Sequence, residues 1–364
     1  RAAYTALLEN EFPDPVTITL PGGQRPAFSL ARHAVTEESA EAAIVKDAGD
    51  DPDVTHGALV VVRVRALAEG EGVRFRAGEG VGTVTREGLS LAVGEPAINP
   101  EPRRMIAAEI AEVAAQYHAP GDVEVEIAIP GGDRLAERTL NGRLGIVGGL
   151  SVLGTTGVVI PFSCSAWIHS IHRSVDVARA AGLNHVAAST GSTSERAVQS
   201  LYHLPEEALI DMGDFVGGTL KYIRRHPVRR LTIAGGFAKL CKLGAGLLDL
   251  HSKRGSVDLD WLAERISDAG GDAAFIESVR CAETAGRALQ LAREVDYPIG
   301  DLVAVAARKT ACEQITDETA IEAATTRCYP AGWTPQSPQR RREARSEQAQ
   351  LVSALAPSVA RGSR

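Results

Sequence analysis

The stretch NHVAASTGSTSERAVQSLYHLPEEALIDMGDFVGGTLKYIRRHPVRRLTIAGG, residues 184–236, decides the fold of the second half of the chain. Short apolar runs alternate in it with longer runs of mixed polarity. We expect strands at residues 184–190, 207–212 and 229–236, with helices between them at residues 193–202 and 214–226. Strands and helices that alternate with short loops are typical of right-handed crossover units on a parallel sheet.

The same alternation continues on both sides of this stretch. We expect one helix at residues 166–182 and further helices at residues 237–248 and 259–316. Residues 151–318 are therefore predicted to form a C-terminal α/β domain of Rossmann-like layout, with a parallel sheet and crossover helices.

The first 150 residues have a different pattern, in which short alternating runs are separated by glycine, proline and aspartate. The runs are VTITL (16–20), ALVVVRVRAL (58–67), VRFRAG (73–78), VGTVT (81–85) and VEVEIAIP (123–130). One helix is expected at residues 102–117. We therefore predict that residues 1–150 form an α+β domain whose antiparallel sheet is covered on one side.

The composition of the 364 residues, 44% hydrophobic and 23% charged, is that of a globular protein. A net charge of −7 argues against a nucleic-acid partner, because neutralising phosphates requires a basic surface. No apolar run reaches the roughly 20 residues of a membrane span, and no signal peptide is recognisable. We therefore expect a cytoplasmic protein without a membrane partner.

The five cysteines are scattered and never spaced as Cys-x-x-Cys, so neither a disulfide framework nor a protein metal site is expected. The chain begins at Arg1 inside a helix-like stretch, from which we expect that its natural beginning is missing. Residues 329–364 are rich in Pro, Gln, Arg and Ser and have no clear period. This composition predicts a disordered tail.

Small and acidic residues follow each of the three strands predicted in the opening stretch. Because the carboxyl ends of parallel strands share one edge, where such sheets bind ligands, these residues are candidates for a cofactor site. An acid about twenty residues after a glycine turn is typical of a ribose contact, but the dinucleotide glycine fingerprint is absent. An adenosine ligand without a pyrophosphate fits better than NAD, and a simple capping and turn role stays open. The candidates are Gly191, Ser192, Ser194, Asp211, Asp214, Gly235 and Gly236.

A second glycine cluster, GIVGGLSVLGTTG at residues 145–157, holds five glycines. It suits either a ligand cradle, with Gly154, Thr155 and Thr156 as candidate contacts, or a tight interdomain crossing, which periodicity alone favours slightly. The Walker phosphate loop is absent, which argues against a nucleotide-hydrolysing enzyme.

The acidic loop VKDAGDDPDVTHG, residues 45–57, has four aspartates. Their spacing does not match an EF-hand, because Gly49 takes a ligand position and no glutamate closes the loop. The loop is either a turn with self-capping carboxylates or a group of carboxylates that raise one another's pKa, with His56 titrating beside them.

Five segments in this order resemble the CbiD family, the cobalt-precorrin-5B C(1)-methyltransferases of anaerobic cobalamin biosynthesis. They are KDAGDDPDVTHG (46–57), GLSLAVGEPAINPEPRRMI (88–106), TLNGRLGIVGGLSVLGTTGVVIPFS (139–163), DMGDFVG (211–217) and GGFAKLCKLGAGLLDLHS (235–252). The resemblance implies that S-adenosylmethionine donates a methyl group to carbon 1 of a corrinoid, converting cobalt-precorrin-5B into cobalt-precorrin-6A. Cobalt would arrive only as part of the substrate.

The resemblance also suggests roles for individual residues. Arg103, Arg104 and Arg143 flank the shared segments and could pair with the carboxylate arms of the corrinoid. Asp50, Asp51 or His56 is the hypothetical base or hydrogen-bond acceptor.

Two other functions stay open: an NAD(P)-dependent oxidoreductase, and a corrinoid-binding protein that is inactive because its termini differ from the family pattern. The implied partner is the small-molecule corrinoid. A second copy of the chain and other enzymes of the cobalamin pathway are further candidate partners.

Overall fold

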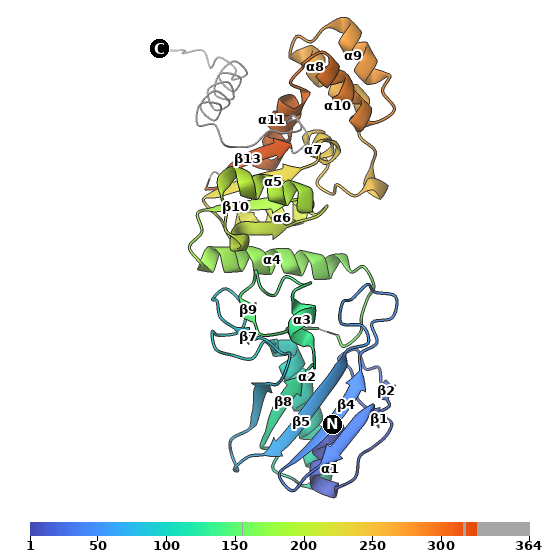
Figure 1. Cartoon of the computed structure of the whole chain (residues 1–364), viewed down its shortest axis with the longest axis vertical. Coiled ribbons are helices and arrows are strands. Elements are labelled where there is room, and N and C mark those ends of the chain that lie inside the picture. Colours follow the sequence, from blue (N-terminus) through green and yellow to red (C-terminus); the bar gives the residue numbers. More distant parts are fainter. Residues whose placement is uncertain (155, 316–317, 326–364) are drawn as a thin grey trace, which may run out of the picture. The chain divides into compact units, whose positions relative to one another are not determined.

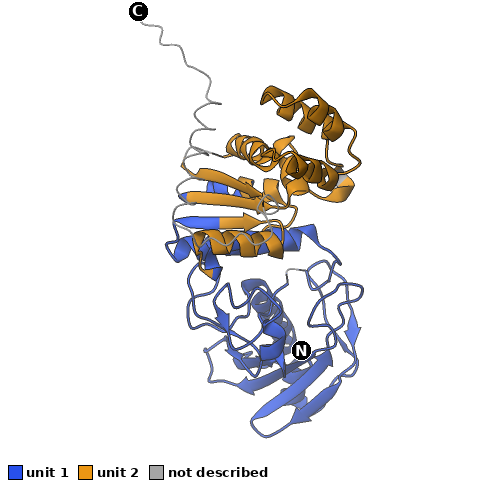
Figure 2. Ribbon diagram, turned by 45° about the horizontal axis from the view of Figure 1, so that its top comes forward, with its two compact units in different colours: residues 1–186, 206–210, 221–229 blue, residues 187–205, 211–220, 230–364 orange. Residues whose placement is uncertain are grey.

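The computed structural model describes residues 1–154, 156–315 and 318–325, which divide into two compact units (Figure 2). Unit 1 consists of residues 1–186, 206–210 and 221–229, and unit 2 consists of residues 187–205, 211–220 and the described residues from 230 onward. Thr155 and the tail predicted at residues 329–364 lie outside the described residues.

The first part of the chain folds into short strands and four helices among the described residues up to 180. The helices are α1 (Ala2–Glu9), α2 (Pro100–Tyr117), α3 (Gly132–Ala136) and α4 (Cys164–Ala180). The strands are β1 (Val16–Thr17), β2 (Ala27–Phe28), β3 (Arg32–Val35), β4 (Ser39–Val45), β5 (Leu59–Ala66), β6 (Val73–Ala77), β7 (Thr83–Val84), β8 (Val123–Ala128) and β9 (Ile146–Val147).

Unit 1 contains a five-stranded sheet with the strand order β3-β4-β5-β8-β6. The pairs from β3 to β8 are antiparallel, as predicted, but β6 pairs with β8 in parallel, so the predicted antiparallel pairing is wrong for β6. The physical reason is the connection: the chain between β6 and β8 includes α2, and a crossover of that length allows a parallel pairing.

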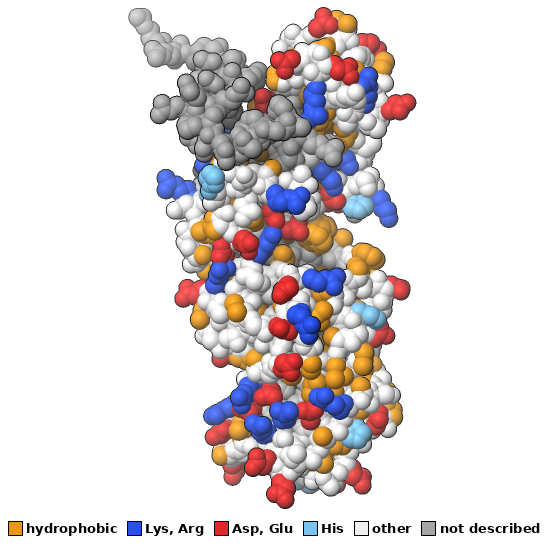
Figure 3. All heavy atoms as spheres, in the orientation of Figure 1, with side chains coloured by type: hydrophobic (Ala, Val, Ile, Leu, Met, Phe, Trp, Pro, Cys, Tyr) orange, Lys and Arg blue, Asp and Glu red, His pale blue; other side chains and the backbone are white. Residues whose placement is uncertain are grey.

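The two faces of this sheet differ in chemistry. Alternate residues such as Val64 and Val125 form a buried core with α1 and α2, which lie against one face (Figure 1). On the other face Arg63 donates to Glu41 at 2.8 Å and to Glu126 at 3.1 Å. Charged side chains of both signs gather over this exposed face (Figure 3). One side of the sheet is therefore covered, as the alternating sequence predicts.

Glycines in unit 1 allow backbone segments to touch. A Cβ atom on Gly80 would lie 2.0 Å from the carbonyl oxygen of Ile129, and one on Gly149 would lie 2.3 Å from the backbone of Gly80. The glycine cluster thus includes a tight crossing, but within unit 1, so the expected interdomain crossing is wrong for Gly149.

The remaining described chain alternates strands and helices, and continues with further helices. The strands are β10 (His185–Ser189), β11 (Leu209–Asp211), β12 (Arg230–Gly235) and β13 (Ala320–Thr325). The helices are α5 (Ser192–Tyr202), α6 (Val216–Arg225), α7 (Phe237–Gly244), α8 (Leu259–Asp268), α9 (Ala273–Arg280), α10 (Ala285–Glu294) and α11 (Ile299–Cys312), with 3-10 turns η1 (Glu206–Ala208) and η2 (Ser252–Arg254).

The four-stranded sheet has the strand order β11-β10-β12-β13. β12 and β13 pair in parallel over their whole length. The sequence did not predict β13, because its residues AIEAAT include three alanines, which favour helices. Its carboxylate Glu322 accepts hydrogen bonds from Arg230 at 2.7 Å and from Tyr202 at 2.8 Å, so tertiary contacts override the local preference.

The expected elements of the opening stretch are present as β10, α5, β11, α6 and β12. α4 begins where Ser163 caps it by accepting a hydrogen bond from the backbone N–H of Ala166. The chain thus has a mixed α/β fold that contains a parallel sheet. Among the described helices, none combines the length and the apolar character needed to cross a membrane.

Candidate functional site

A cavity of about 500 Å³ lies in unit 1. It is bounded by the acidic loop between β4 and β5, by residues 88–91, by the segment from Thr139 to Leu153 and by α4. The loop at residues 88–91 can approach α4 closely because Gly88 has a positive φ of 98° and because a Cβ there would meet the backbone of Asp176 at 2.7 Å. Polar side chains interrupt the mainly apolar walls: Lys46, Asp53, Thr55, Ser90, Asn99, Thr139, Asn141, Ser151, Ser170, Arg173 and Asp176.

Asp53 is the aspartate of the acidic loop that lines the cavity. Its Oδ1 accepts hydrogen bonds from the backbone N–H of Thr55 at 2.8 Å and from the Thr55 hydroxyl at 2.7 Å, and its Oδ2 pairs with the Lys46 ammonium. Burial alone would raise the pKa of Asp53, but the hydrogen bonds from Lys46 and Thr55 outweigh it and hold the pKa below its ordinary value. The expectation of mutually raised pKa values is therefore wrong for Asp53.

The three acceptors proposed from the sequence lie on the same loop but do not line the cavity. Asp51 accepts a hydrogen bond from the backbone N–H of Phe162 at 3.0 Å, which ties the loop to the segment before α4. His56 accepts one at Nδ1 from the backbone N–H of Ala48 at 3.1 Å, and Asp50 is exposed. Across the described residues, no group of three or more His, Cys, Asp or Glu side chains is arranged to hold a metal ion.

Asn141 is a buried polar residue of the cavity wall that sequence reasoning missed. Its amide nitrogen donates to the carbonyl of Gly149 at 3.2 Å, and its amide oxygen accepts from the Ser151 hydroxyl at 3.3 Å. These bonds fix the turn that contains the glycine cluster. The signal was present, because Asn141 is a polar residue inside one of the segments that resemble the CbiD family.

Arg173 on α4 was also missed, although Ser170, Arg173 and Asp176 recur at intervals of three residues and therefore share one side of the helix. Burial lowers the pKa of the Arg173 guanidinium. Asp176 is engaged elsewhere: its two carboxylate oxygens accept from the Tyr222 hydroxyl at 2.9 and 2.8 Å.

Tyr222 belongs to a stack of rings beside α4. Its ring lies 3.8 Å from that of His172 and 4.1 Å from that of His226, measured between centroids. Burial and the hydrogen bond to Asp176 raise the pKa of Tyr222 to about 12. Burial, with His169 nearby, lowers the pKa of His172, so both rings favour their neutral forms.

The arginines predicted to bind substrate already have partners in the structure. Arg103 donates to the carbonyls of Ile98 at 2.7 Å and Pro96 at 3.1 Å, which makes it a brace for the start of α2. Arg104 is exposed and pairs with Glu101, and Arg143 is partly buried and also has an interaction partner.

The segment after the cavity wall carries several exposed apolar side chains. Leu153 is 58% exposed, Ile160 64% and Phe162 77%, and Val158 and Val159 lie between them. Of the candidate contacts here, Gly154 has a φ of 145° with open space beside it, and the Thr156 hydroxyl donates to the carbonyl of Val158 at 3.2 Å. Large apolar side chains exposed together in one segment make it a candidate binding surface.

Unit 2 brings the predicted strand ends together. The backbone N–H of Thr190 donates to Ala234 and that of Met212 donates to Ser189, so the ends of β11, β10 and β12 are adjacent. Gly191 and Gly236 are the residues that precede α5 and α7. The hydroxyl of Ser189, a residue only 1% exposed, has no hydrogen-bond partner in the part of the chain that the structure describes.

Several of the predicted contacts at this edge already have interaction partners. The Ser194 hydroxyl donates to the carbonyl of Gly191 at 2.8 Å, and Asp214 pairs with the Lys239 ammonium. Ser192 is exposed at the start of α5, and Gly235 ends β12. Asp211, the last residue of β11, is partly buried and has an interaction partner.

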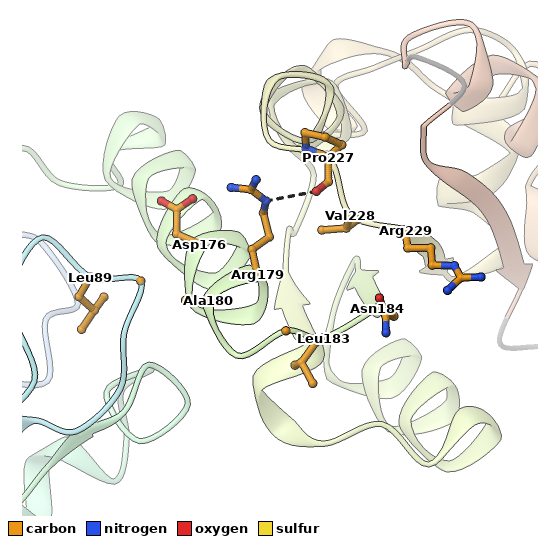
Figure 4. Close-up of a pocket in the computed structure, with 11 residues that line it drawn as sticks. Leu89, Asp176, Arg179, Ala180, Leu183, Asn184, Pro227, Val228 and Arg229 are labelled. Atoms are coloured by element: carbon orange, nitrogen blue, oxygen red, sulfur yellow. Dashed lines mark hydrogen bonds between the residues drawn. The ribbon is translucent and has the colours of Figure 1, made fainter.

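A second, more open cavity of about 630 Å³ lies at the other end of α4 (Figure 4). The Nε of Arg179 donates to the carbonyl of Pro227 at 3.2 Å across it. Asp176 lines both cavities, but none of the site residues predicted from the sequence lines this one.

Comparisons with known proteins agree with the sequence motifs. The family model described as CbiD matches residues 1–161, and the one described as CbiD, C-terminal domain, matches residues 249–327. A solved structure described as cobalamin biosynthesis protein (cbiD) from Archaeoglobus fulgidus is 23% identical, covers 70% of this chain and 78% of its own, and superposes with a TM-score of 0.35.

Curated relatives are far more similar in sequence. The cobalt-precorrin-5B C(1)-methyltransferase of Bradyrhizobium sp. (strain BTAi1 / ATCC BAA-1182) is 60% identical over 318 residues, 87% of this chain and 85% of its own. The protein of the same name from Paramagnetospirillum magneticum is 59% identical over 313 residues, 86% of this chain and 87% of its own. Identity of this level over most of both chains, together with both family matches, shows that this chain belongs to the CbiD family.

Proposed function

We propose that this protein is a methyltransferase of cobalamin biosynthesis that methylates carbon 1 of cobalt-precorrin-5B to give cobalt-precorrin-6A. The observation that carries the proposal is the 60% identity, over 87% of the chain, to a protein named for that reaction. The names of the relatives support neither the oxidoreductase nor the inactive binding protein. The corrinoid is the partner in this proposal, and the cytoplasmic location and a homo-oligomer stay predictions.

The proposal divides the work between two domains. Residues 1–150 form the α+β domain that carries corrinoid-binding loops, and residues 151–318 form the Rossmann-like domain that binds the methyl donor and whose first part also lines the corrinoid cavity. The strand order supports the methyl-donor site in the Rossmann-like domain. β10 lies between β11 and β12 in the sheet, and the chain passes from β10 to β11 on one side of it and then to β12 on the other side. In open α/β sheets, ligands bind where the strand order reverses in this way, which here is between the ends of β10 and β12.

The residues at that reversal fit S-adenosylmethionine, which would supply the methyl group when bound. The unpartnered Ser189 hydroxyl is a buried donor that a ligand can satisfy. Gly191, Gly235 and Gly236 permit close backbone approach beside the first turns of α5 and α7. In this proposal Asp211 accepts from a ribose hydroxyl and Ser192 donates to the ligand.

The engaged side chains have supporting roles in the same proposal. Ser194 fixes Gly191 through its hydrogen bond, and Asp214 holds Lys239 at the start of α7. These contacts keep the two glycine loops in place before the ligand arrives. A loop that is already ordered loses less conformational entropy when the ligand binds.

The corrinoid is proposed to bind at the unit 1 cavity and along the exposed apolar segment. The apolar side chains of residues 153–162 would cover part of the macrocycle and exclude water, and Gly154, Thr155 and Thr156 would contact its edge. Arg104 and Arg143 would pair with acidic arms, while Arg103 braces α2. Asp50 or His56, both exposed, would accept a hydrogen bond from the substrate, and Asp51 would hold the loop through Phe162.

The proposal is tested by incubating the purified protein with cobalt-precorrin-5B and S-adenosylmethionine under anaerobic conditions. Mass spectrometry should find the corrinoid heavier by one methyl group, with one S-adenosylhomocysteine formed for each product. Calorimetry should detect binding of S-adenosylhomocysteine and no binding of NADP. Binding of NADP without S-adenosylhomocysteine, and an unmethylated corrinoid, would reject the proposal in favour of an oxidoreductase.

A further inference from the structure

Arg173 is a positive charge at the cavity wall that the proposed reaction does not yet use. It lies on the same side of α4 as Ser170 and Asp176 and lines the 500 Å³ cavity. No hydrogen bond or ion pair of its side chain is found within the described residues 1–154, 156–315 and 318–325. It is partly buried, and its pKa is lowered by that burial alone.

No carboxylate of the cavity wall forms a hydrogen bond or ion pair with Arg173 within the described residues. Asp53 is occupied by Lys46 and by two hydrogen bonds from Thr55. Both oxygens of Asp176 accept from the Tyr222 hydroxyl. The two carboxylates of the wall thus have other partners, and so does the Lys46 ammonium.

A guanidinium in this position destabilises the folded protein unless a ligand pairs with it. Taking a charge out of water without a partner disfavours the folded state, and most of the surrounding wall is apolar. Burial also strengthens any ion pair that forms there, because screening by water is weaker. The planar guanidinium matches a carboxylate in two parallel hydrogen bonds, which makes an organic acid the fitting ligand.

We propose that Arg173 binds a carboxylate of the ligand that enters the unit 1 cavity. This rests on the proposed function in one respect: the ligand is then an acidic arm of the corrinoid substrate, with the adjoining macrocycle against the apolar wall. The cavity volume is within the range of small-molecule sites, about 300–1,000 Å³. Arg173 would then select substrates with a free acid at that arm.

The experiment compares two probes that differ only in their acid groups: cobyrinic acid, a cobalt corrinoid with free carboxylates, and its heptamethyl ester. Each is titrated by calorimetry against the parent protein, Arg173→Gln, Arg173→Lys and the control Arg134→Gln, an exposed arginine of α3. Arg173→Gln should bind cobyrinic acid about tenfold more weakly than the parent, because it loses a hydrogen-bonded charge pair. Arg173→Lys should bind with intermediate affinity, and the ester should bind the parent and Arg173→Gln alike.

Thermal unfolding without ligand separates this role from a structural one. If Arg173 has a partner only when ligand is bound, Arg173→Gln removes an unpaired charge from the free protein. The melting temperature of Arg173→Gln should then equal or exceed that of the parent. Equal binding of the acid by parent and Arg173→Gln, equal weakening of acid and ester, or no binding of the acid by the parent would each overturn the proposal. Loss of acid binding in a protein that fails to methylate cobalt-precorrin-5B would support the Arg173 site while rejecting the proposed reaction.

Discussion

Asp53 shows at the scale of a single residue why composition misleads about electrostatics. Four aspartates within one loop suggest mutual repulsion and raised pKa values, yet the Lys46 ammonium and the Thr55 donors hold the pKa of Asp53 below its ordinary value. Lys46 stands seven residues earlier, on the other side of the loop, so only the folded turn brings the two together. The sequence identified an unusual loop but could not identify which carboxylate faces the cavity.

The first prediction concerns this carboxylate. Asp53→Asn should lower the free energy of unfolding by about 1 kcal/mol at neutral pH, because it removes the ion pair with Lys46 and leaves that ammonium only the neutral Thr55 hydroxyl as a partner. Partial exposure of the pair limits the effect. Since the folded-state pKa of Asp53 is lowered, its contribution is present above pH 3.8 and is lost as pH falls through the folded value.

Urea titrations at neutral and acidic pH measure this, with Asp50→Asn, an exposed aspartate of the same loop, as the control. Asp53→Asn should lose less stability than the parent between neutral pH and about pH 3. Identical stability of the two variants at neutral pH would contradict the assignment.

The second prediction concerns the buried hydroxyl at the end of β10. Ser189→Ala removes a group without a hydrogen-bond partner among the described residues, so stability should stay equal or rise slightly. Affinity for S-adenosylhomocysteine, measured by calorimetry, should fall about five- to tenfold if the ligand satisfies that hydroxyl.

Ser194→Ala is the matched control for this prediction. It removes a hydroxyl that donates to Gly191, so it should lower stability by about 1 kcal/mol. If Ser189→Ala binds S-adenosylhomocysteine with unchanged affinity, the methyl donor does not contact the Ser189 hydroxyl.

At the scale of elements, the alternation of strands and helices over residues 184–236 could be predicted from the sequence, because each buried apolar strand is followed by a helix of mixed polarity. The strand β13 could not be predicted, since its three alanines favour a helix and long-range contacts, including those from Arg230, Arg308 and β12, hold it extended. The parallel pairing of β6 with β8 was missed for a related reason. Alternation predicts which face of a strand is buried, but not which neighbour it selects.

The candidate site shows the same limit. The motif segments pointed to the acidic loop, the glycine cluster and the strand ends. They could not show that Arg103 braces α2 or that Arg173, far along the chain, shares a cavity with Asn141. Contacts over long sequence distances follow from packing, which a single sequence does not specify.

The third prediction concerns the exposed apolar segment before α4. Phe162→Asn should weaken corrinoid binding about five- to thirtyfold by removing an apolar contact worth roughly 1–2 kcal/mol. Asparagine is the suitable replacement, because Phe162 has a positive φ of 55°, which asparagine tolerates.

Fluorescence titration with cobyrinic acid measures this effect. Val295→Asn, at an exposed valine of unit 2, is the control and should leave the affinity unchanged. If Phe162→Asn binds the corrinoid like the parent, the segment does not cover the macrocycle.

At the scale of the whole molecule, each unit has a tyrosine whose pKa is raised to about 12. Burial and Glu322 act on Tyr202 in unit 2, and burial and Asp176 act on Tyr222 in unit 1. Because the folded-state pKa lies above the ordinary value of 10, the stabilisation is complete below pH 10 and is lost as pH rises to 12.

The fourth prediction follows from these two residues. The free energy of unfolding should fall between pH 10 and 12, by about 1 kcal/mol for Tyr202 after allowance for its partial exposure. Tyr202→Phe should reduce this alkaline loss, and Tyr222→Phe should reduce it separately. Urea titrations across that pH range provide the measurement, and an alkaline loss unaffected by both substitutions would contradict the assignment.

The central claim for the whole molecule is methyl transfer to carbon 1 of cobalt-precorrin-5B. Its most direct test uses S-adenosylmethionine labelled with carbon-13 in the methyl group, followed by nuclear magnetic resonance of the isolated corrinoid. We predict that the labelled methyl group appears on carbon 1 of the product. A label that stays on the donor, or that appears on another ring carbon, would contradict the claim.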